Sequence, residues 1–108
     1  MLNQNELQSL LHILRDSFKA IFGEQFDRMI LFGSRARGDY REDSDVDILV
    51  VLKGEFNDLA VMEQTSEFIA RLSLESDVLI SRKFISSDKF QHGRSPFLQN
   101  VAKEGVLI

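Results

Sequence analysis

Apolar residues recur every three or four positions between Asn5 and Phe22. They fall on one stripe made up of Leu7, Leu10, Leu11, Leu14, Phe18 and Ile21. This spacing is typical of an amphipathic helix that packs one face against a core. Asn5 with Gln8 fits a capping box at the start of the helix, and Gly23 fits a left-handed cap at its end. We therefore predict a helix over Asn5–Phe22.

Two short apolar runs follow, and neither has helical spacing. Arg28–Phe32 stops at Gly33 and leads into a stretch rich in glycine, arginine, aspartate and serine that extends to Ser44. Val46–Leu52 is almost continuously apolar and rich in β-branched residues, which favours a strand covered on both faces. These patterns predict two strands joined by a polar loop.

The next two elements are a helix and a short strand. Asn57–Ser73 carries an apolar stripe behind Asn57, a residue type that commonly caps helices. Asp77–Ile80 is short and mostly apolar, which favours a third strand. The stretch Lys83–Arg94 has no firm period, so no element is assigned to it.

The end of the chain carries a second set of helix signals. Ser95 followed by Pro96 predicts a helix start, and Gly105 predicts its end before a short edge strand over Val106–Ile108. The order is then helix, strand, strand, helix, strand, helix and a final strand. This order predicts the α/β (α+β) class, with helices packed on a small mixed sheet.

Length and composition limit what such a domain can do. The chain has 108 residues, a formal net charge of −4, no cysteine and two histidines. Residues 1–108 are thus expected to form a single domain, and any metal would be bound through oxygen. An acidic balance argues against generic nucleic-acid binding. No apolar run approaches the ~20 residues of a membrane span, so we expect a cytoplasmic protein without a membrane contact.

The main chemical signal is a pair of aspartates, Asp45 and Asp47, at the start of the second strand. Side chains alternate along a strand, so both carboxylates are expected to point to one face. Two adjacent negative charges leaving water need a cation, and hard oxygen ligands select Mg²⁺ or Mn²⁺ over zinc. On its own, such a pair is more often a strand end decorated with solvated carboxylates.

The loop before the aspartates shifts this balance towards a binding site. Gly33 permits close approach of the backbone, and Ser34 can donate a hydrogen bond to a phosphate oxygen. Arg35 and Arg37 can neutralise further negative charge. An anion site and a metal site within one loop match a metal-bound nucleoside triphosphate.

These residues resemble a known family. Gly33-Ser34, ten residues and then Asp45-Val46-Asp47 is similar to the signature of the polymerase β-like nucleotidyltransferases. The sequence around this motif, from Leu31 to Gly38 and from Ser44 to Val50, resembles that of their minimal nucleotidyltransferase (MNT) branch. The resemblance implies the polymerase β-like fold, with ATP as the substrate and two Mg²⁺ ions, or Mn²⁺, as the cofactor.

The resemblance also implies roles for individual residues. Asp45 and Asp47 would bind the metal ions. Asp77 would be a third catalytic carboxylate that shares one ion and helps to deprotonate the attacking hydroxyl. The resemblance further implies AMP transfer to a protein hydroxyl, with the MNT member as the antitoxin of an all-helical HEPN ribonuclease toxin. The acceptor in that toxin would be a tyrosine, and a hetero-oligomer is expected.

Two other functions fit the same sequence. One is a non-catalytic module that neutralises its partner by contact alone. The other is a subunit of a small-molecule nucleotidyltransferase of the antibiotic-modifying type, completed by a second chain. Shortness favours the protein acceptor, because a single small domain has little room to enclose a substrate.

Overall fold

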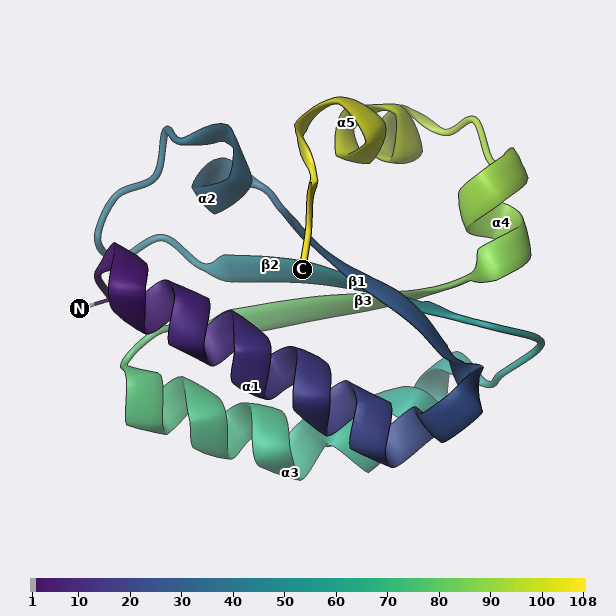
Figure 1. The fold of residues 1–108 in the computed structure, drawn as a ribbon, viewed down its shortest axis with the longest axis horizontal. Coiled ribbons are helices and arrows are strands. Elements are labelled where there is room, and N and C mark those ends of the chain that lie inside the picture. Colours follow the sequence, from purple (N-terminus) through teal and green to yellow (C-terminus); the bar gives the residue numbers. More distant parts are fainter. Residues whose placement is uncertain (1) are drawn as a thin grey trace.

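One four-stranded sheet, in the order β3-β2-β1-β4, lies between two layers of helices (Figure 1). The computed structural model describes residues 2–108. Its elements are α1 (Gln4–Phe22), a 3₁₀ turn η1 (Gly23–Gln25), β1 (Phe26–Phe32), α2 (Ser34–Arg37), β2 (Val46–Leu52), α3 (Asp58–Ser76), β3 (Ile80–Ser86), α4 (Ser87–His92), α5 (Pro96–Glu104) and β4 (Val106–Leu107).

The sheet is mixed, which confirms the predicted fold class. β1 pairs antiparallel with β2 and with β4, whereas β2 pairs parallel with β3. A parallel pair needs a crossover connection, and α3 supplies it. Because β2 and β3 run in the same direction, both begin at the same end of the sheet. Val46 at the start of β2 lies opposite Ile80 at the start of β3.

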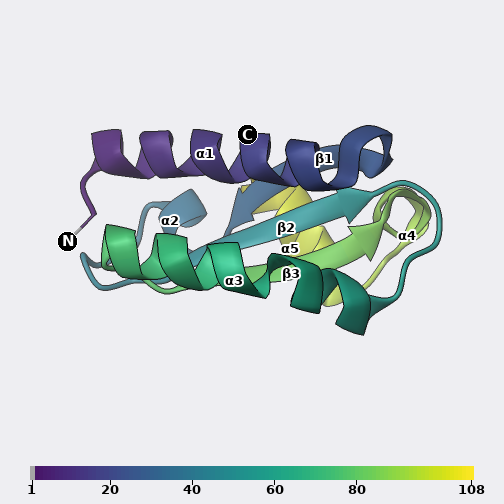
Figure 2. The same ribbon diagram turned by 90° about the horizontal axis from the view of Figure 1, so that it is seen from below.

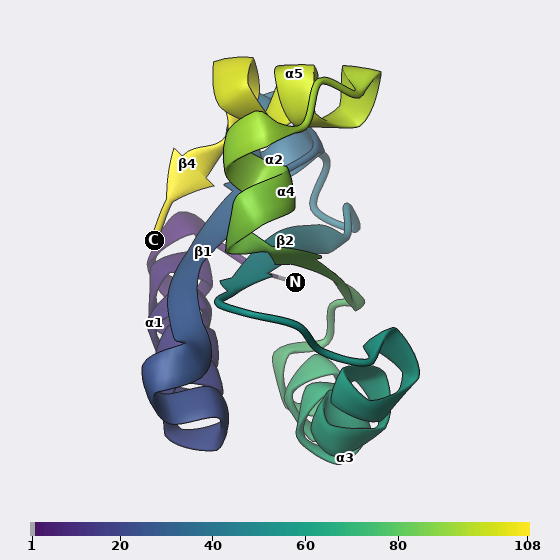
Figure 3. The ribbon, with the colours of Figure 1, turned by 90° about the vertical axis from the view of Figure 1, so that its right-hand side faces the viewer.

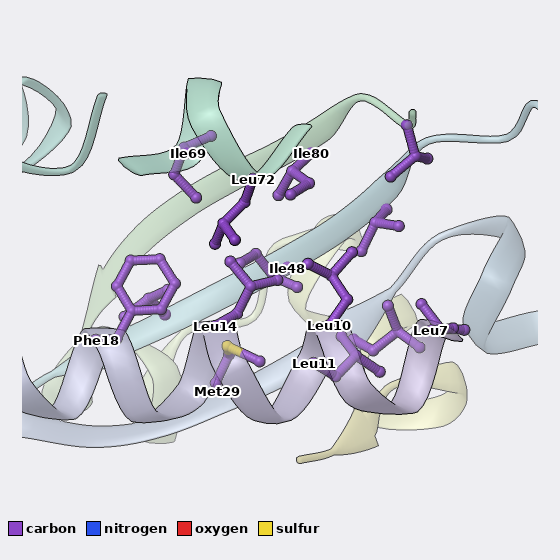
Figure 4. Packing of buried hydrophobic residues seen from close by; sticks show 14 of the residues in the cluster. Leu7, Leu10, Leu11, Leu14, Phe18, Met29, Ile48, Ile69, Leu72 and Ile80 are labelled. Atoms are coloured by element: carbon purple, nitrogen blue, oxygen red, sulfur yellow. The ribbon is translucent and has the colours of Figure 1, made fainter. Parts of the chain in front are cut away.

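The two long helices, α1 and α3, cover one face of the sheet (Figure 2). Their apolar stripes meet alternate residues of β1 and β2, including Met29 and Ile48, which are fully buried (Figure 4). Phe18 is fully buried at the centre of this layer and contacts Phe68 edge to face, with ring centroids 5.3 Å apart. The predicted helical stripe therefore forms one side of the core.

The three shorter helices lie on the opposite face (Figure 3). A smaller apolar cluster of Ile30, Leu49, Val51 and Val101 lies under α5, with Phe32 and Phe97 packed against it. Consecutive residues of β2 thus point alternately to the two helical layers, which explains why the strand is apolar almost throughout. Asp47 belongs to the face that α5 covers, since it alternates in step with Leu49.

Most of the predicted helix ends are confirmed. Asn57 caps α3 by accepting a hydrogen bond from the Ala60 amide at 3.0 Å. Ser95 caps α5, with Pro96 in the first turn. Gly23 ends α1 at the predicted position, but its φ of +57° goes with a ψ of −128°, so the cap is not the left-handed one that the sequence predicts.

The predicted start of the first helix is wrong by two residues. Asn3, rather than Asn5, caps α1, and it forms a reciprocal capping box with Glu6. Both asparagines have an acidic or amide residue three positions later, so local spacing does not distinguish them. The choice of Asn3 places Leu2 and Leu7 in the same buried cluster, as in a hydrophobic staple.

The third strand also differs from the prediction. α3 continues to Ser76, and β3 spans Ile80–Ser86 instead of Asp77–Ile80. Part of the stretch that showed no period, Lys83–Arg94, thus completes this strand and forms α4. No helix in the described part of the chain, residues 2–108, is both long and apolar enough to cross a membrane.

Candidate active site

Asp45 and Asp47 lie at the end of the sheet where β2 begins. Asp45 is exposed directly before the strand, and Asp47 is half-buried as its second residue. In the antiparallel pairing, Asp47 lies opposite Phe32, the last residue of β1. The hairpin therefore brings the aspartate pair next to Gly33, where the chain leaves β1.

Gly33 is the residue against which the Asp47 carboxyl group packs. Its φ of +77° is unfavourable for residues with a side chain. A Cβ atom at this position would also lie 3.2 Å from Cγ of Asp47 and closer still to Oδ2. Both the backbone angle and the contact require glycine, as the motif predicts.

Burial and a neighbouring negative charge make the ionised form of the Asp47 carboxyl group less favourable. Burial raises the pKa of Asp47, and the neighbouring charge of Asp45 raises it further. Lys83 and Arg37 act in the opposite direction, without outweighing the first two effects. Two nearby carboxylates, one of them half-buried, thus remain incompletely neutralised by the protein.

α2 begins directly after Gly33 and has Ser34 as its first residue. The amides of Ala36 and Arg37 both donate to the Gly33 carbonyl, each at 3.1 Å. These bonds begin at Ala36, so the amides of Ser34 and Arg35 come before the first helical hydrogen bond of the turn. Ser34 therefore stands where the sequence predicts it, between the end of β1 and the aspartate pair.

Arg35 does not have the position expected of a nucleotide ligand. It is only 5% exposed. Its Nε donates to the Ser44 carbonyl at 3.0 Å and its Nη2 to the Glu42 carbonyl at 3.2 Å, while the guanidinium packs over the Tyr40 ring. This side chain holds the loop that leads to Asp45, and a contact from Arg35 to nucleotide stays a prediction.

Arg37 is accessible and lies near the aspartates. Its guanidinium pairs with Asp39 at 3.3 Å and with Glu104 of α5 at 3.6 Å. Arg37 is one of the two cations that lower the pKa of Asp47. Arg37 is thus the more accessible of the two predicted phosphate contacts.

Asp77 lies at the same end of the sheet but not on a strand. It is the C-cap of α3, with a left-handed φ of 52°, and it is exposed. Extending the parallel register back from Ile80 would place Asp77 level with Asp43 instead of Asp47. Within residues 2–108, no three carboxylate or histidine groups are arranged to hold a metal ion. The described structure thus brings Asp45 and Asp47 together at the start of β2, and the catalytic role of Asp77 stays a prediction.

Three residues near the pair were not found from the sequence. Lys83 of β3 and Phe97 of α5 form a cation–π contact of 4.5 Å, and Glu104 holds Arg37 from the other end of α5. Lys83 lies within the stretch without a firm period. Alternation along Ile80–Ser86 could have placed Lys83 on the face of Asp47, given the parallel register.

The donor set of the pair fits a hard divalent cation. Asp45 and Asp47 offer only oxygen ligands, and Mg²⁺ is commonly held by one or two carboxylates together with waters and substrate phosphates. Burial and the charge of Asp45 raise the pKa of Asp47, and a cation bound beside it would act against both effects. A separate cavity of about 670 Å³, lined by residues including Phe56, Phe84 and Lys89, lies at the opposite end of β2 and β3.

Fold and site together define a nucleotidyltransferase domain, and comparison with known families agrees. Residues 11–106 match the family model described as "Nucleotidyltransferase domain". The chain therefore belongs to this family.

Two curated relatives come from Methanocaldococcus jannaschii. The protein named "Putative protein adenylyltransferase MJ0141" is 40% identical over 76 residues, which cover 70% of this chain and 76% of the relative. "Putative protein adenylyltransferase MJ0604" is 29% identical over 93 residues, which cover 86% of this chain and 88% of the relative.

Solved structures share the fold. A nucleotidyltransferase structure from Sulfolobus solfataricus superposes with a TM-score of 0.58 at 27% identity, covering 94% of this chain and 74% of that one. A MntA–HpeT toxin–antitoxin structure gives a TM-score of 0.56 at 24% identity, covering 100% of this chain and 72% of that one. A toxin–antitoxin structure with AMP-PNP gives a TM-score of 0.55 at 24% identity, covering 98% of this chain and 72% of that one.

Proposed function

We propose that this domain is a Mg²⁺-dependent protein adenylyltransferase that transfers AMP from ATP to a hydroxyl group of a partner protein. The observation that carries the proposal is the half-buried Asp47, held against Gly33 with the charge of Asp45 beside it. The names of the two archaeal relatives support the choice of a protein as acceptor.

Asp45 and Asp47 would hold the metal with their two carboxylates, and phosphates of the substrate would supply further ligands. When bound, the metal neutralises phosphate charge and stabilises the leaving pyrophosphate. The backbone at Gly33 and the hydroxyl of Ser34 approach the phosphates, and Arg37 neutralises further negative charge. The protein thus acts mainly by positioning.

The transfer forms a bond between the acceptor oxygen and the α-phosphorus of ATP. It breaks the bond from that phosphorus to the bridging oxygen, and pyrophosphate leaves. The acceptor's proton is released to solvent at the open end of the sheet, where Asp45 is exposed. A pair of which one member is exposed suits a macromolecular acceptor, which brings its own binding surface.

We further propose that the partner is an all-helical HEPN ribonuclease toxin, that a tyrosine of that toxin is the acceptor, and that this domain is the cytoplasmic antitoxin. The sequence resemblance to MNT proteins supports this part of the proposal. The similarity in fold to a MntA–HpeT toxin–antitoxin structure is consistent with it.

The decisive experiment uses ATP labelled at either the α or the γ phosphate. The protein is incubated with Mg²⁺ and a candidate all-helical partner protein, and label on the partner is measured. Label from the α position only is expected, at a tyrosine identified by mass spectrometry. Asp45→Asn and Asp47→Asn are each expected to reduce labelling by about 100-fold or more. Asp77→Asn is expected to reduce labelling by a smaller factor, because Asp77 is the C-cap of α3 and does not lie on a strand beside Asp47.

Other outcomes identify the alternatives. Label from the γ phosphate would indicate a kinase. No label, together with full neutralisation of the toxin by an Asp45→Asn/Asp47→Asn double variant, would indicate a module that acts by contact. Turnover with free aminoglycosides or nucleosides and no need for a helical partner would indicate a small-molecule enzyme.

A further inference from the structure

We propose that Lys83 is a phosphate-binding residue of this site and contacts the phosphate chain of the nucleotide. This inference deepens the proposed nucleotidyl transfer and rests on it. The sequence motif does not include Lys83, which lies more than thirty positions after the aspartate pair. The argument comes from the sheet register and from the contacts of α5.

The sheet places Lys83 on the same face as Asp47. Lys83 lies opposite Leu49 in the parallel pairing of β2 and β3, and paired residues of neighbouring strands point to the same face. Asp47 lies two positions before Leu49 and shares that face. Lys83 and Asp47 are therefore diagonal neighbours, close enough for a lysine stem to reach back towards the carboxylates.

The amino group of Lys83 is held in place without an ionic partner. Its Nζ lies 4.5 Å from the centre of the Phe97 ring, and Phe97 in turn packs edge to face on Phe32, 5.2 Å away. Phe32 lies opposite Asp47 in the β1–β2 pairing. None of the ion pairs formed among residues 2–108 includes Lys83. The charge is thus oriented by an aromatic face but remains available to an anion.

α5 supports two cations around Asp47. Phe97, near its start, holds Lys83, and Glu104, at its end, pairs with Arg37 at 3.6 Å. Both cations act on the Asp47 carboxyl group. A bound triphosphate brings several negative charges to the aspartate pair, more than the metal alone would balance. Cations on two sides of the pair supply that balance.

The test is direct binding of ATP, pyrophosphate and adenosine by calorimetry, with Mg²⁺ present. Lys83→Gln is expected to weaken ATP and pyrophosphate binding by about tenfold and to leave adenosine binding unchanged. Lys83→Arg keeps the charge and is expected to restore most of the affinity. Lys53→Gln removes the same charge at the far end of β2 and is the matched control, with no expected effect.

A second measurement separates phosphate binding from simple compensation of Asp47. The comparison is made in an Asp47→Asn background with EDTA, where neither the carboxylate nor the metal is present. Lys83→Gln is expected to weaken pyrophosphate binding there too, by a similar factor. Unchanged pyrophosphate binding in that background would overturn the proposal and leave Lys83 as a counterion of Asp47.

These outcomes are distinct from failure of the proposed function. If the wild-type protein binds ATP and pyrophosphate but labels no partner, the transfer proposal fails while the assignment of Lys83 is still decided by the binding data. Should Lys83→Gln fold poorly, Phe97→Leu provides a second variant, because it keeps the lysine but removes the ring that orients it. A loss of ATP affinity of smaller size is expected from Phe97→Leu, and wild-type affinity contradicts the role given to the ring.

Discussion

The carboxyl group of Asp47, on β2, packs against the backbone of Gly33, which directly follows β1. The contact leaves no room for a side chain at position 33, since a Cβ atom would lie 3.2 Å from Cγ of Asp47 and closer to Oδ2. The residue that turns the chain out of β1 is therefore also the residue that sets the position of a proposed metal ligand.

Gly33→Ala is expected to damage both stability and activity. The φ of +77° with a ψ of −161° lies in a region that is essentially restricted to glycine and costs alanine about 1–3 kcal/mol, and the clash with Asp47 adds to this cost. Gly54→Ala is the matched control, because Gly54 has a φ of +76° but nothing within 4 Å of the added Cβ. Urea unfolding should show a larger loss for Gly33→Ala, and only this variant should lose adenylyl transfer. Equal losses of activity in both variants would contradict the assigned contact.

Ionisation of Asp47 is expected to lower the stability of the fold, whereas ionisation of Asp27 is expected to raise it. Burial raises the pKa of Asp47, so in metal-free protein the folded state holds its proton more tightly than the unfolded chain. Stability then falls as pH rises through the window between the ordinary value of 3.8 and the higher folded pKa. Asp47→Asn should therefore raise the Tm at pH 7 in EDTA, and this gain should shrink as the pH falls below the folded pKa.

Asp27 shows the reverse behaviour. Burial acts to raise its pKa, but a hydrogen bond from Ser87 and the charges of Arg28 and Lys53 outweigh this effect and lower it below 3.8. The resulting stability is present above pH 3.8 and is lost as the pH falls through the lowered value. Asp27→Asn should lower the Tm at pH 7, with the difference closing in strong acid. A gain in Tm for Asp27→Asn at pH 7 would refute this account.

Arg35→Gln is expected to loosen the loop before Asp45. The guanidinium donates to two loop carbonyls from a site that is 5% exposed, and losing such bonds costs about 2 kcal/mol or more. Arg41→Gln changes an exposed arginine of the same loop and should cost no more than about 0.5 kcal/mol. Hydrogen exchange should show faster exchange over the loop in Arg35→Gln only. If nucleotide affinity falls while loop exchange is unchanged, Arg35 binds the nucleotide after all.

Phe18→Ala should destabilise the layer of long helices without a direct effect on the site. Phe18 is fully buried and contacts the rings of Phe22, Phe68 and Phe84. Its removal should cost about 3–5 kcal/mol, measured by urea unfolding. At temperatures where the variant remains folded, its affinity for MgATP should match that of the wild type.

The sequence was most informative where one physical signal dominated. Helical spacing located α1, and the caps Asn57 and Ser95 located the starts of α3 and α5. The motif around Gly33 predicted correctly that Asp45 and Asp47 lie beside this turn. Only glycine meets both requirements at position 33, which are a positive φ and close contact with Asp47. These signals are local, so a single sequence displays them in full.

Prediction failed where the decisive contacts were distant in sequence. β3 lies at an edge of the sheet, and its residues are mixed on both faces, so no clean alternation marks it. The position of Asp77 depended on how far α3 continues. Arg35 was predicted to contact nucleotide because of its charge. Its burial depends on the fold of the loop that follows it, which local sequence does not reveal.

The hairpin formed by β1, α2 and β2 carries all the motif residues of the site. Gly33, Ser34, Asp45 and Asp47 all lie between the first residue of β1 and the last residue of β2. New chain ends made at the exposed turn after β2, near Gly54, would cut no part of this segment. A circular permutant opened there, with its original ends joined by a linker, should keep the aspartate pair in register. The motif residues of the site are in this sense one continuous unit of sequence, to which β3 adds Lys83 and α5 adds the contacts that hold the two cations.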